Sequence, residues 1–381
     1  MSKKLLRLLK CLFISLCGLA GTIRSAPEVP AAVSDDWNLA LPGWKYSFPA
    51  DHGSHPDFKT EWWYFTGNLK SEDGREFGYQ LTFFRQGVRP PSDRPPSTSR
   101  FVVDHIQFVH FAISDVSRGQ FYFHQDLTRG AFGESGFNQD NRLTWVENNA
   151  LELLPDGGFR IVGKGPEKSI DLILKPAKPV VFHGSDGVSQ KAEGPGRASH
   201  YYSYTRLISD GQLRIGDDTF TVHGTSWYDH EWATNQLTAE QQGWDWFSLQ
   251  FDDGSELMLF QIRTKDGGRD PFSSGTFIHA DGTTTAVKNA DFVLTPGRTW
   301  KSKASSANYP VTWQLEIESL DLKLDISARL DSQELVLTPI SYWEGSIQAD
   351  GTRAGSQVTA LGYLEMTGYA GAIVGMQAPA E

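Results

Sequence analysis

The segment EWWYFTGNL (residues 61–69) has a counterpart in GWDWFSLQF (residues 243–251), later in the chain. Aligning Trp62 with Trp244 superimposes the two aromatic runs at an offset of 182 residues (244 − 62 = 182). Each run leads into an Asp-Gly turn and then into a second apolar run. This order is typical of a β-hairpin. The repeat therefore predicts that the same hairpin opens each half of the chain.

The rest of the chain extends this β pattern. Aromatic residues make up 12% of the sequence, and 37 glycines and 19 prolines supply turns between short apolar runs. The return strand of the first predicted hairpin ends at Arg85, and that of the second ends at Arg263. No long segment has helical periodicity, although a short helix after residue 231 is compatible with the sequence. We predict an all-β, antiparallel architecture, a barrel or sandwich that occurs twice.

The N-terminus reads as a targeting segment and not as part of the fold. Four basic residues within 1–10 precede the uncharged run CLFISLCGLA (residues 11–20), the layout of a secretory signal peptide, which we assign to residues 1–26. The apolar run is too short to span a membrane, which needs about 20 apolar residues. The alternative to a cleaved signal peptide is a retained amphipathic anchor. The only two cysteines, Cys11 and Cys17, lie in this segment. The mature chain would then lack disulfides, thiolate metal sites and a cysteine nucleophile.

Two domains are predicted after the signal peptide. Residues 27–43 read as a flexible leader, residues 44–235 as the first domain and residues 236–381 as the second. The Pro/Gly/Ser-rich segment 176–199 is predicted to be a long loop, either a lid over a barrel mouth or a disordered connection.

The net charge of the chain disfavours some classes of binding partner. Removal of residues 1–20, which corresponds to cleavage after Ala20, takes away four basic and no acidic residues and changes the net charge from −11 to −15. Nucleic acids and anionic lipid surfaces are poor partners for such a chain. No later apolar run approaches membrane-spanning length, so the mature protein is expected to be soluble, and periplasmic or secreted.

The segment GTSWYDHEWATNQ (residues 224–236) concentrates aromatic and titratable side chains. In an extended strand, alternate residues share a face. One face would carry Trp227, Asp229 and Glu231, and the other Tyr228, His230 and Trp232. Periodicity alone does not say which face points inward, and a bulge would change the assignment.

Two kinds of active site are disfavoured here. Asp229, His230 and Glu231 have suitable ligand atoms for a metal, but consecutive strand residues diverge and no HExxH pattern is present. We predict neither a metal nor an organic cofactor. The G-x-S-x-G motif of serine hydrolases is also absent, since GESGF (residues 133–137) fails at its last position.

Acid catalysis by a buried carboxyl fits the composition better. A carboxyl group among tryptophans loses solvation, so its pKa rises and it stays protonated near neutrality. Asp229, Glu231 and Glu61 each lie beside tryptophans, whose rings would stabilise a carbocation. The alternative is structural, with these carboxylates binding arginine or indole N–H groups to hold strands together.

Several motifs in the same order resemble one family. KTEWWYFTGNL, EFGYQLTFFR, HFAISD, YYSYTRL, VHGTSWYDHEW and GWDWFSLQFDDGSELMLFQIR (between residues 59 and 263) resemble the AttH/CrtC-like family, and the match extends over residues 44–370. The resemblance implies two tandem lipocalin-like antiparallel β-barrels around an apolar pocket. It implies the chemistry of carotenoid 1,2-hydratase, in which water adds to an isoprenoid double bond without a cofactor. Exported members are often labelled secreted hydrolases, and nothing in this sequence supplies their nucleophile.

These observations predict a protein that encloses an isoprenoid or lipid-like ligand and hydrates it. Asp229 is the predicted acid, aided by His230, Glu231 and Glu61. Arg85 and His110 are predicted to be structural partners or to orient a carboxylate. The predicted pocket residues are Trp63, Tyr64, Tyr202, Trp227, Trp232, Trp244 and Trp246. The rival hypothesis is a non-catalytic periplasmic lipid carrier that works with an ABC transporter. A third is a stable double barrel whose polar residues only join its domains.

Overall fold

The computed structural model describes residues 36–96, 99, 101–337 and 341–371. The predicted signal peptide and residues 27–35 of the predicted leader lie outside this range. In the described part, no helix has the length and apolar character needed to cross a membrane.

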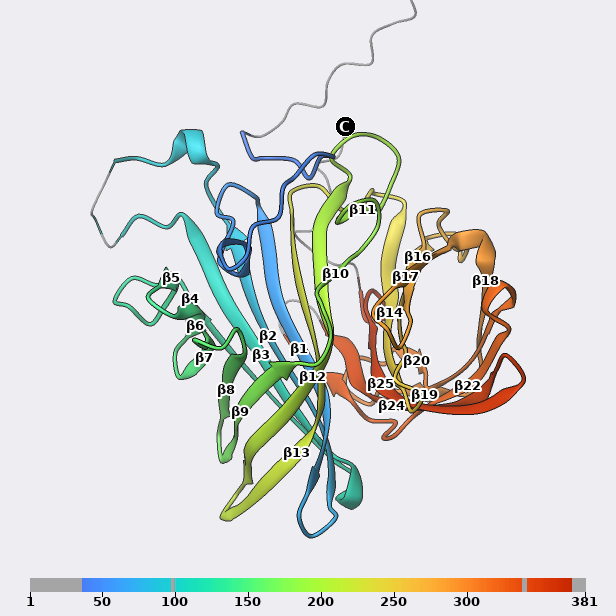
Figure 1. The fold of residues 1–381 in the computed structure, drawn as a ribbon. Coiled ribbons are helices and arrows are strands. Elements are labelled where there is room, and N and C mark those ends of the chain that lie inside the picture. Colours follow the sequence, from blue (N-terminus) through green and yellow to red (C-terminus); the bar gives the residue numbers. More distant parts are fainter. Residues whose placement is uncertain (1–35, 97–98, 100, 338–340, 372–381) are drawn as a thin grey trace, which may run out of the picture. The chain divides into compact units, whose positions relative to one another are not determined.

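The first half of the chain forms one antiparallel sheet that closes nearly into a barrel (Figure 1). Its strand order is β4-β3-β2-β1-β13-β12-β9-β8-β7-β6-β5, and the short strands β10 and β11 both pair with β12. The elements are η1 (Ala50–His52), β1 (Thr60–Ser71), β2 (Glu76–Gly87), η2 (Pro91–Asp93), β3 (His105–Asp115), η3 (Val116–Arg118), β4 (Gln120–Thr128), β5 (Ser135–Gln139), β6 (Arg142–Val146), β7 (Asn149–Leu153), β8 (Phe159–Gly165), β9 (Lys168–Pro176), β10 (Val181–Phe182), β11 (Val188–Gln190), β12 (Ala198–Ile215) and β13 (Asp218–Ala233).

The second half forms another nearly closed antiparallel barrel, ordered β17-β16-β15-β14-β25-β24-β22-β21-β18, with β23 beside β24. Two short strands, β19 and β20, pair only with each other. The elements are β14 (Gln241–Phe251), β15 (Glu256–Thr264), β16 (Ser274–Ile278), β17 (Thr284–Lys288), η4 (Asn289–Asp291), β18 (Phe292–Pro296), β19 (Thr299–Lys301), β20 (Asn308–Pro310), β21 (Thr312–Ile317), η5 (Glu318–Leu320), β22 (Leu322–Ala328), β23 (Glu334–Leu335), β24 (Tyr342–Arg353) and β25 (Ser356–Met366).

The sequence repeat corresponds to equivalent strands. The run at 61–69 lies in β1 and the run at 243–251 in β14, and each is the first strand of its sheet. Each pairs on one side with the next strand (β2 or β15) and on the other with the last strand of its sheet (β13 or β25). The prediction of two tandem antiparallel barrels is confirmed.

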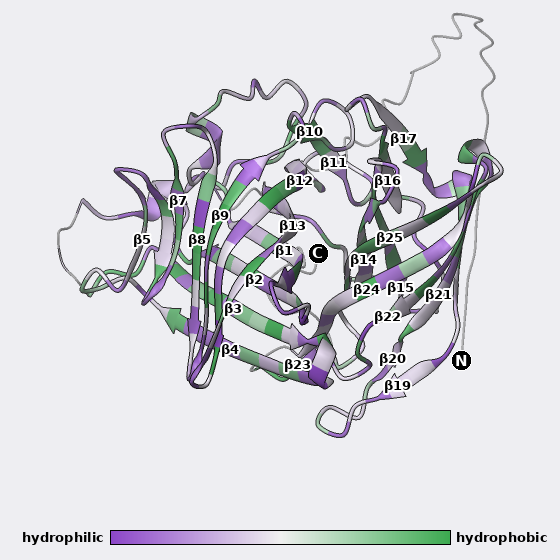
Figure 2. Cartoon of the chain, turned by 60° about the horizontal axis from the view of Figure 1, so that its bottom comes forward, coloured by the Kyte–Doolittle hydropathy of each residue, from purple (hydrophilic) through white to green (hydrophobic). Residues whose placement is uncertain are grey.

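Strand alternation separates core from surface, and bands of hydrophobic and hydrophilic residues follow one another along the strands (Figure 2). In β22, Leu322, Leu324 and Ile326 point into the second barrel while Lys323 and Asp325 are exposed. Strands β1 and β13 differ, because almost every residue in their adjoining ends is buried. One face of these strands fills the first barrel, and the other packs against the second barrel.

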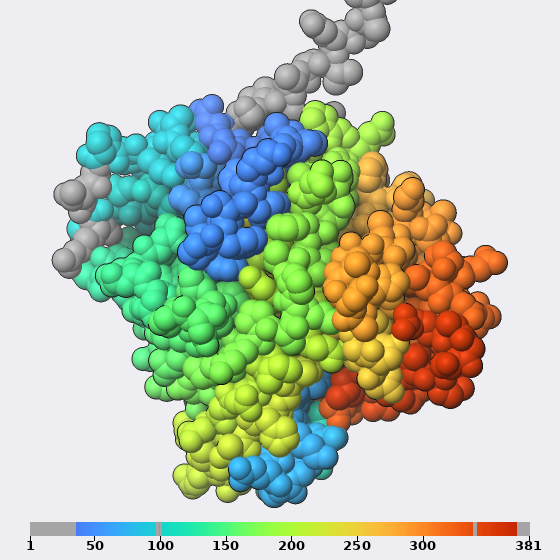
Figure 3. All heavy atoms as spheres, viewed as in Figure 1, coloured from blue at the N-terminus to red at the C-terminus, as the bar shows by residue number. Residues whose placement is uncertain are grey.

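A third apolar cluster lies between the two barrels. It includes Tyr64 and Trp227 from the first sheet and Trp246, Phe260 and Tyr363 from the second. In the space-filling view, the green surface around β10 to β12 adjoins the orange surface of the second sheet (Figure 3).

Buried polar contacts support this junction. The ammonium of Lys178 is 2.7 Å from the carboxylate of Glu256, and Arg206 Nε is 2.6 Å from the same group. His183 Nδ1 is 2.9 Å from the Thr276 hydroxyl. We refer to this junction as the seam.

Two details differ from the predictions. Segment 176–199, predicted to be a long loop, contains β10 and β11, because its backbone pairs with β12. The residues that follow position 231 form the end of β13 and then turns, with no helix up to Gln241. The predicted domain boundary, between residues 235 and 236, lies between β13 and β14.

Candidate active site

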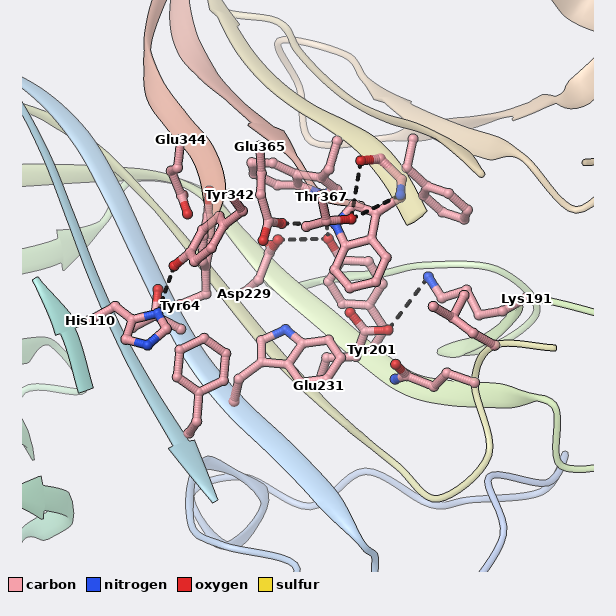
Figure 4. Close-up of a pocket in the computed structure, with 18 of the residues that line it drawn as sticks. Tyr64, His110, Lys191, Tyr201, Asp229, Glu231, Tyr342, Glu344, Glu365 and Thr367 are labelled. Carbon is pink, nitrogen blue, oxygen red and sulfur yellow. Dashed lines mark hydrogen bonds and ion pairs between the residues drawn. The ribbon is translucent and has the colours of Figure 1, made fainter. Parts of the chain in front are cut away.

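A cavity of about 180 Å³ lies in the seam, lined by side chains from both sheets (Figure 4). Strands β1, β2, β3, β12 and β13 line it from one side, and β14, β15, β24 and β25 from the other. Its walls are mainly aromatic. They include Trp62, Tyr64, Phe84, Phe108, Trp244 and Trp246. We call this cavity the seam pocket.

The sequence repeat supplies the centre of the pocket wall. Trp62 and Tyr64 project from β1, and their repeat equivalents Trp244 and Trp246 project from β14. Tyr64 meets Trp246 edge to face, with ring centroids 5.1 Å apart. An antiparallel strand presents alternate residues on one face, so these two pairs point out of their own barrels and meet at the seam.

Asp229 points from β13 into this pocket. Its carboxyl accepts hydrogen bonds from the Tyr201 hydroxyl at 2.7 Å, from Trp227 Nε1 at 2.5 Å and from the Ser203 hydroxyl. All three of these donors are neutral. Burial raises the pKa of Asp229 from 3.8 to about 7, although the three hydrogen bonds favour the carboxylate and limit the rise. The carboxyl is therefore poised between its two protonation states near neutral pH.

Glu365 occupies the matching position in the second barrel. Asp229 lies opposite Tyr64 in the β1–β13 pair, and Glu365 lies opposite Trp246 in the β14–β25 pair. Trp244 Nε1 donates a hydrogen bond to Glu365 at 2.9 Å. Burial raises the pKa of Glu365 to about 7, and the charges of Glu231 and Asp229 act in the same direction. The pocket thus contains two carboxyls at matching positions of the two sheets, Asp229 and Glu365, and burial is the main cause of the raised pKa of each.

Lys191 supplies a positive charge at one end of the pocket. Lys191 follows β11, and its ammonium is 3.5 Å from Glu231 Oε1 and 3.9 Å from the centre of the Phe260 ring. Burial lowers the pKa of Lys191, and the Glu231 charge opposes this. Lys191 and Glu231 therefore form a buried ion pair beside the aromatic wall.

The opposite face of β13 points into the first barrel and has different chemistry. The carboxylate of Glu61 receives Arg85 Nε at 2.9 Å, His230 Nε2 lies at 3.0 Å and His55 Nδ1 at 2.8 Å. Burial opposes the charge of Glu61, but Arg85 and the two histidines hold the pKa of Glu61 well below its ordinary value. This closed network holds the end of the first barrel together, away from the pocket.

The same network contains the group of side chains whose geometry comes nearest to a metal site in the described part of the chain. The ligand atoms of His55, Glu61 and His230 lie within 4.8 Å of one another. Both histidines lie against one oxygen of Glu61, and Arg85 donates to the other. A cation bound here would face the guanidinium of Arg85 across the same carboxylate, which disfavours it.

The structure separates the predicted site residues into two groups. Of the predicted catalytic residues, Asp229 and Glu231 line the seam pocket, while His230 and Glu61 belong to the first-barrel network. Of the predicted pocket residues, Tyr64, Trp244 and Trp246 line the pocket, Trp227 reaches it through its hydrogen bond to Asp229, and Trp63, Tyr202 and Trp232 pack inside the first barrel. His110 and Arg85 were predicted to be structural partners or to orient a carboxylate; His110 lines the pocket, and Arg85 binds Glu61.

Sequence reasoning missed Glu344, Glu365 and Lys191. The repeat relates Glu365 to Asp229, because Asp229 lies opposite Tyr64 and Glu365 lies opposite Trp246, the repeat equivalent of Tyr64. Lys191 lies in segment 176–199, which was predicted to be a loop, so the sequence did not indicate it as a pocket residue.

Stability is expected to fall as pH rises from about 4 to about 7. In that window Asp229 and Glu365 hold protons in the folded state that they release in the unfolded state, so deprotonation favours unfolding. A pKa that rises from 3.8 to about 7 corresponds to about 4 kcal/mol. Urea unfolding should show Asp229→Asn gaining stability relative to the wild type between pH 4 and pH 8. The exposed change Asp171→Asn is the control, and a constant difference across this range would contradict the assignment.

Comparison with known proteins places these features in a family context. The family model described as AttH-like matches residues 39–369. A crystal structure of a Nitrosomonas europaea protein provisionally called AttH is 32% identical, with 87% of this chain and 99% of that chain covered and a TM-score of 0.77. The crystal structure of kievitone hydratase from Nectria haematococca shares the fold at 15% identity, covering 88% of this chain and 97% of that one, with a TM-score of 0.67.

Two curated relatives match over shorter stretches. Kievitone hydratase of Fusarium solani subsp. phaseoli is 28% identical over 268 residues, which is 68% of this chain and 74% of the relative. Dehydratase asqC of Emericella nidulans is 23% identical over 256 residues, which is 61% of this chain and 69% of the relative.

Proposed function

The chain belongs to the AttH-like family, and from this premise we propose that it is a hydratase-type enzyme acting on an apolar, unsaturated, isoprenoid-like ligand in the seam pocket. The observation that carries the proposal is Asp229, a buried carboxyl with neutral hydrogen-bond donors and a pKa raised to about 7, facing an aromatic cavity. Relatives named as a hydratase and a dehydratase support the reaction type. The two reactions share one transition state, run in opposite directions.

The proposed first step is proton transfer from Asp229 to the ligand. The π electrons of the double bond form a C–H bond with this proton, which leaves a carbocation on the neighbouring carbon and a carboxylate on Asp229. The faces of Trp62, Tyr64 and Trp246 are available to stabilise the cation. The Tyr201 hydroxyl, itself bonded by Trp246 Nε1 at 3.1 Å, stabilises the carboxylate that forms.

Water then completes the reaction. Its oxygen forms a C–O bond with the cation, and the surplus proton goes to the carboxylate of Glu365. Burial raises the pKa of Asp229 and that of Glu365 to about 7, so together the two carboxyls hold about one proton near neutral pH. Proton exchange between the pair and solvent restores the starting state. Dehydration would follow the same steps in reverse.

Turnover is expected to be bell-shaped in pH, with its maximum near pH 7. At higher pH Asp229 loses the proton it must donate, and at lower pH Glu365 is already protonated and accepts none. Initial rates of water addition to geraniol between pH 5 and pH 9 would measure this. A rate that is flat across the whole range would contradict the assignment of the pair.

The rival hypothesis, a carrier that works with an ABC transporter, makes a different prediction for the ligand. The ligand that co-purifies with the protein would be identified by mass spectrometry and then incubated with fresh protein in H₂¹⁸O. A hydratase converts it to an alcohol containing ¹⁸O, whereas a carrier returns it unchanged. Recovery of unchanged ligand, with no ¹⁸O incorporated by hydration or by dehydration followed by rehydration, would overturn the proposed function. The predicted export to the periplasm is part of this proposal.

A further inference from the structure

Glu344 is a buried carboxyl in the pocket wall that the proposed reaction does not use. It projects from β24 and is 1% exposed. Neither of its side-chain oxygens has a hydrogen-bond partner among the described residues. Burial raises the pKa of Glu344 well above its ordinary value, the charge of Glu365 adds to this and the Tyr64 hydroxyl opposes it, so burial favours the neutral acid. A buried acid with no partner is costly unless it binds something.

Support of its neighbour does not account for Glu344. In the first sheet, Ser203 lies opposite Asp229 and donates a hydrogen bond to it. Glu344 lies opposite Glu365 in the equivalent pair of the second sheet, yet it forms no hydrogen bond with Glu365. The position that holds a supporting hydroxyl in one barrel holds an unpartnered acid in the other.

A second unpartnered group lies nearby. The Tyr64 hydroxyl is buried and lies beside the Glu344 carboxyl, but the two do not meet the geometry of a hydrogen bond, and neither has another partner among the described residues. Burial raises the pKa of Tyr64 well above its ordinary value, and its interaction with Glu344 adds to this, so the hydroxyl keeps its proton. The Tyr342 hydroxyl is 2.7 Å from His110 Nδ1, and burial lowers the pKa of His110 to about 3, so this pair is also neutral.

These four side chains gather at one end of the pocket, while Lys191 and Glu231 lie at the other end, with Asp229 between them (Figure 4). The first end offers hydrogen-bond donors and acceptors without formal charge. An anionic ligand group placed there would meet no cation from the described lining residues and would lie against Glu344.

We propose that Glu344 and Tyr64 form a binding subsite for a neutral hydroxyl or carbonyl group of the ligand. The acid O–H of Glu344 donates to the ligand oxygen, and a ligand hydroxyl donates in turn to Tyr64 or to the free oxygen of Glu344. The substrate class is then an amphipathic, uncharged molecule with an apolar unsaturated skeleton and an alcohol, phenol or ketone at one end. This inference rests on the proposed function only in placing the ligand in the seam pocket.

The test compares three probes that share one skeleton. Geraniol can donate and accept a hydrogen bond, geranyl methyl ether can only accept, and 2,6-dimethylocta-2,6-diene can do neither. Binding is followed by the fluorescence of the full-length protein, because Trp62, Trp244 and Trp246 line the pocket. In the wild type, geraniol should bind on the order of 10- to 100-fold more tightly than the hydrocarbon, with the ether in between.

Variants show whether Glu344 is responsible. Glu344→Leu should remove most of the preference for geraniol, and should fold, since it replaces an unpartnered buried acid with an apolar side chain. Glu344→Gln keeps a donor and an acceptor and should retain the preference. Equal affinity of the wild type for geraniol and the hydrocarbon, no binding of geraniol, or an unchanged preference in Glu344→Leu would each overturn the subsite.

The binding measurement is independent of catalysis. Asp229→Asn should keep the preference for geraniol, since Asp229 does not belong to this end of the pocket. A protein that prefers geraniol through Glu344 but never hydrates it supports the subsite and refutes the proposed function. A protein that binds the alcohol and the hydrocarbon with equal affinity and hydrates both supports the proposed function and refutes the subsite.

Discussion

Asp229→Asn is expected to lower the rate of water addition to geraniol by about 10²- to 10⁴-fold. Asparagine has nearly the same shape and can still bond Tyr201 and Trp227, but it has no acidic proton to transfer. Geraniol affinity should stay within about threefold, since the amide preserves the pocket wall, and a factor of three is below 1 kcal/mol. The loss would therefore appear in kcat and not in KM. Steady-state kinetics at pH 6.5 would measure both.

Asp171→Asn is the matched control, because it makes the same chemical change at an exposed site on β9 paired with Arg160. It should leave turnover unchanged. An Asp229→Asn enzyme with wild-type kcat would remove Asp229 from the mechanism and shift attention to Glu365.

Arg85→Met is expected to lower the free energy of unfolding by about 3–5 kcal/mol. Arg85 and Glu61 are both fully buried, so loss of the guanidinium leaves a buried carboxylate whose remaining partners are two histidine rings, the Ser54 hydroxyl and the backbone N–H of His55. The same guanidinium donates to the backbone oxygens of His55 at 3.0 Å and Phe58 at 2.8 Å, and both oxygens would lose this donor. Urea denaturation at pH 7 would measure the change.

The exposed ion pair between Lys323 and Glu316 provides the comparison. Its side chains are 66% and 57% exposed, so Lys323→Met should cost less than about 1 kcal/mol. A similarly small effect for Arg85→Met would show that the first-barrel network does not hold the fold together. Retained binding of geraniol in a folded Arg85→Met protein is expected, because Arg85 does not line the pocket.

The fold was predictable because its signals are local. The aromatic hairpin at 61–69, its repeat at 243–251 and the Asp-Gly turns are properties of short segments, and hydrogen bonding turns such segments into strands. The alternation along β13 was also predictable, and the structure divides Trp227, Asp229 and Glu231 from Tyr228, His230 and Trp232 as expected. The sequence did not predict which of the two faces points into the first barrel and which faces the second barrel.

Both faces of β13 are buried, and periodicity alone does not distinguish them. One faces the interior of the first barrel and the other faces the second barrel, so aromatic and charged residues occur on each. Glu61 and His230 lie among tryptophans, as Asp229 does, yet Arg85 neutralises Glu61 and no arginine bonds Asp229 among the described donors. This difference depends on the strand register, which brings Arg85 opposite Glu61.

Glu344 and Glu365 depend on longer-range geometry. Each is a single glutamate in an otherwise ordinary strand, and the pairing of β14 with β25 and of β25 with β24 brings them to the pocket. Lys191 reaches the pocket because β11 pairs with β12 and thereby fixes a segment whose composition predicts a loop.

The central claim is that Asp229 is a protonated acid in the seam pocket, and its titration can be measured without knowing the ligand. The infrared difference spectrum between wild type and Asp229→Asn isolates the carboxyl stretch of this residue. We predict a protonated carboxyl band at pH 5 that is lost with a midpoint near pH 7. A spectrum in which Asp229 is already ionised at pH 5 would contradict the account, because a carboxylate at that pH has no proton to give to a double bond.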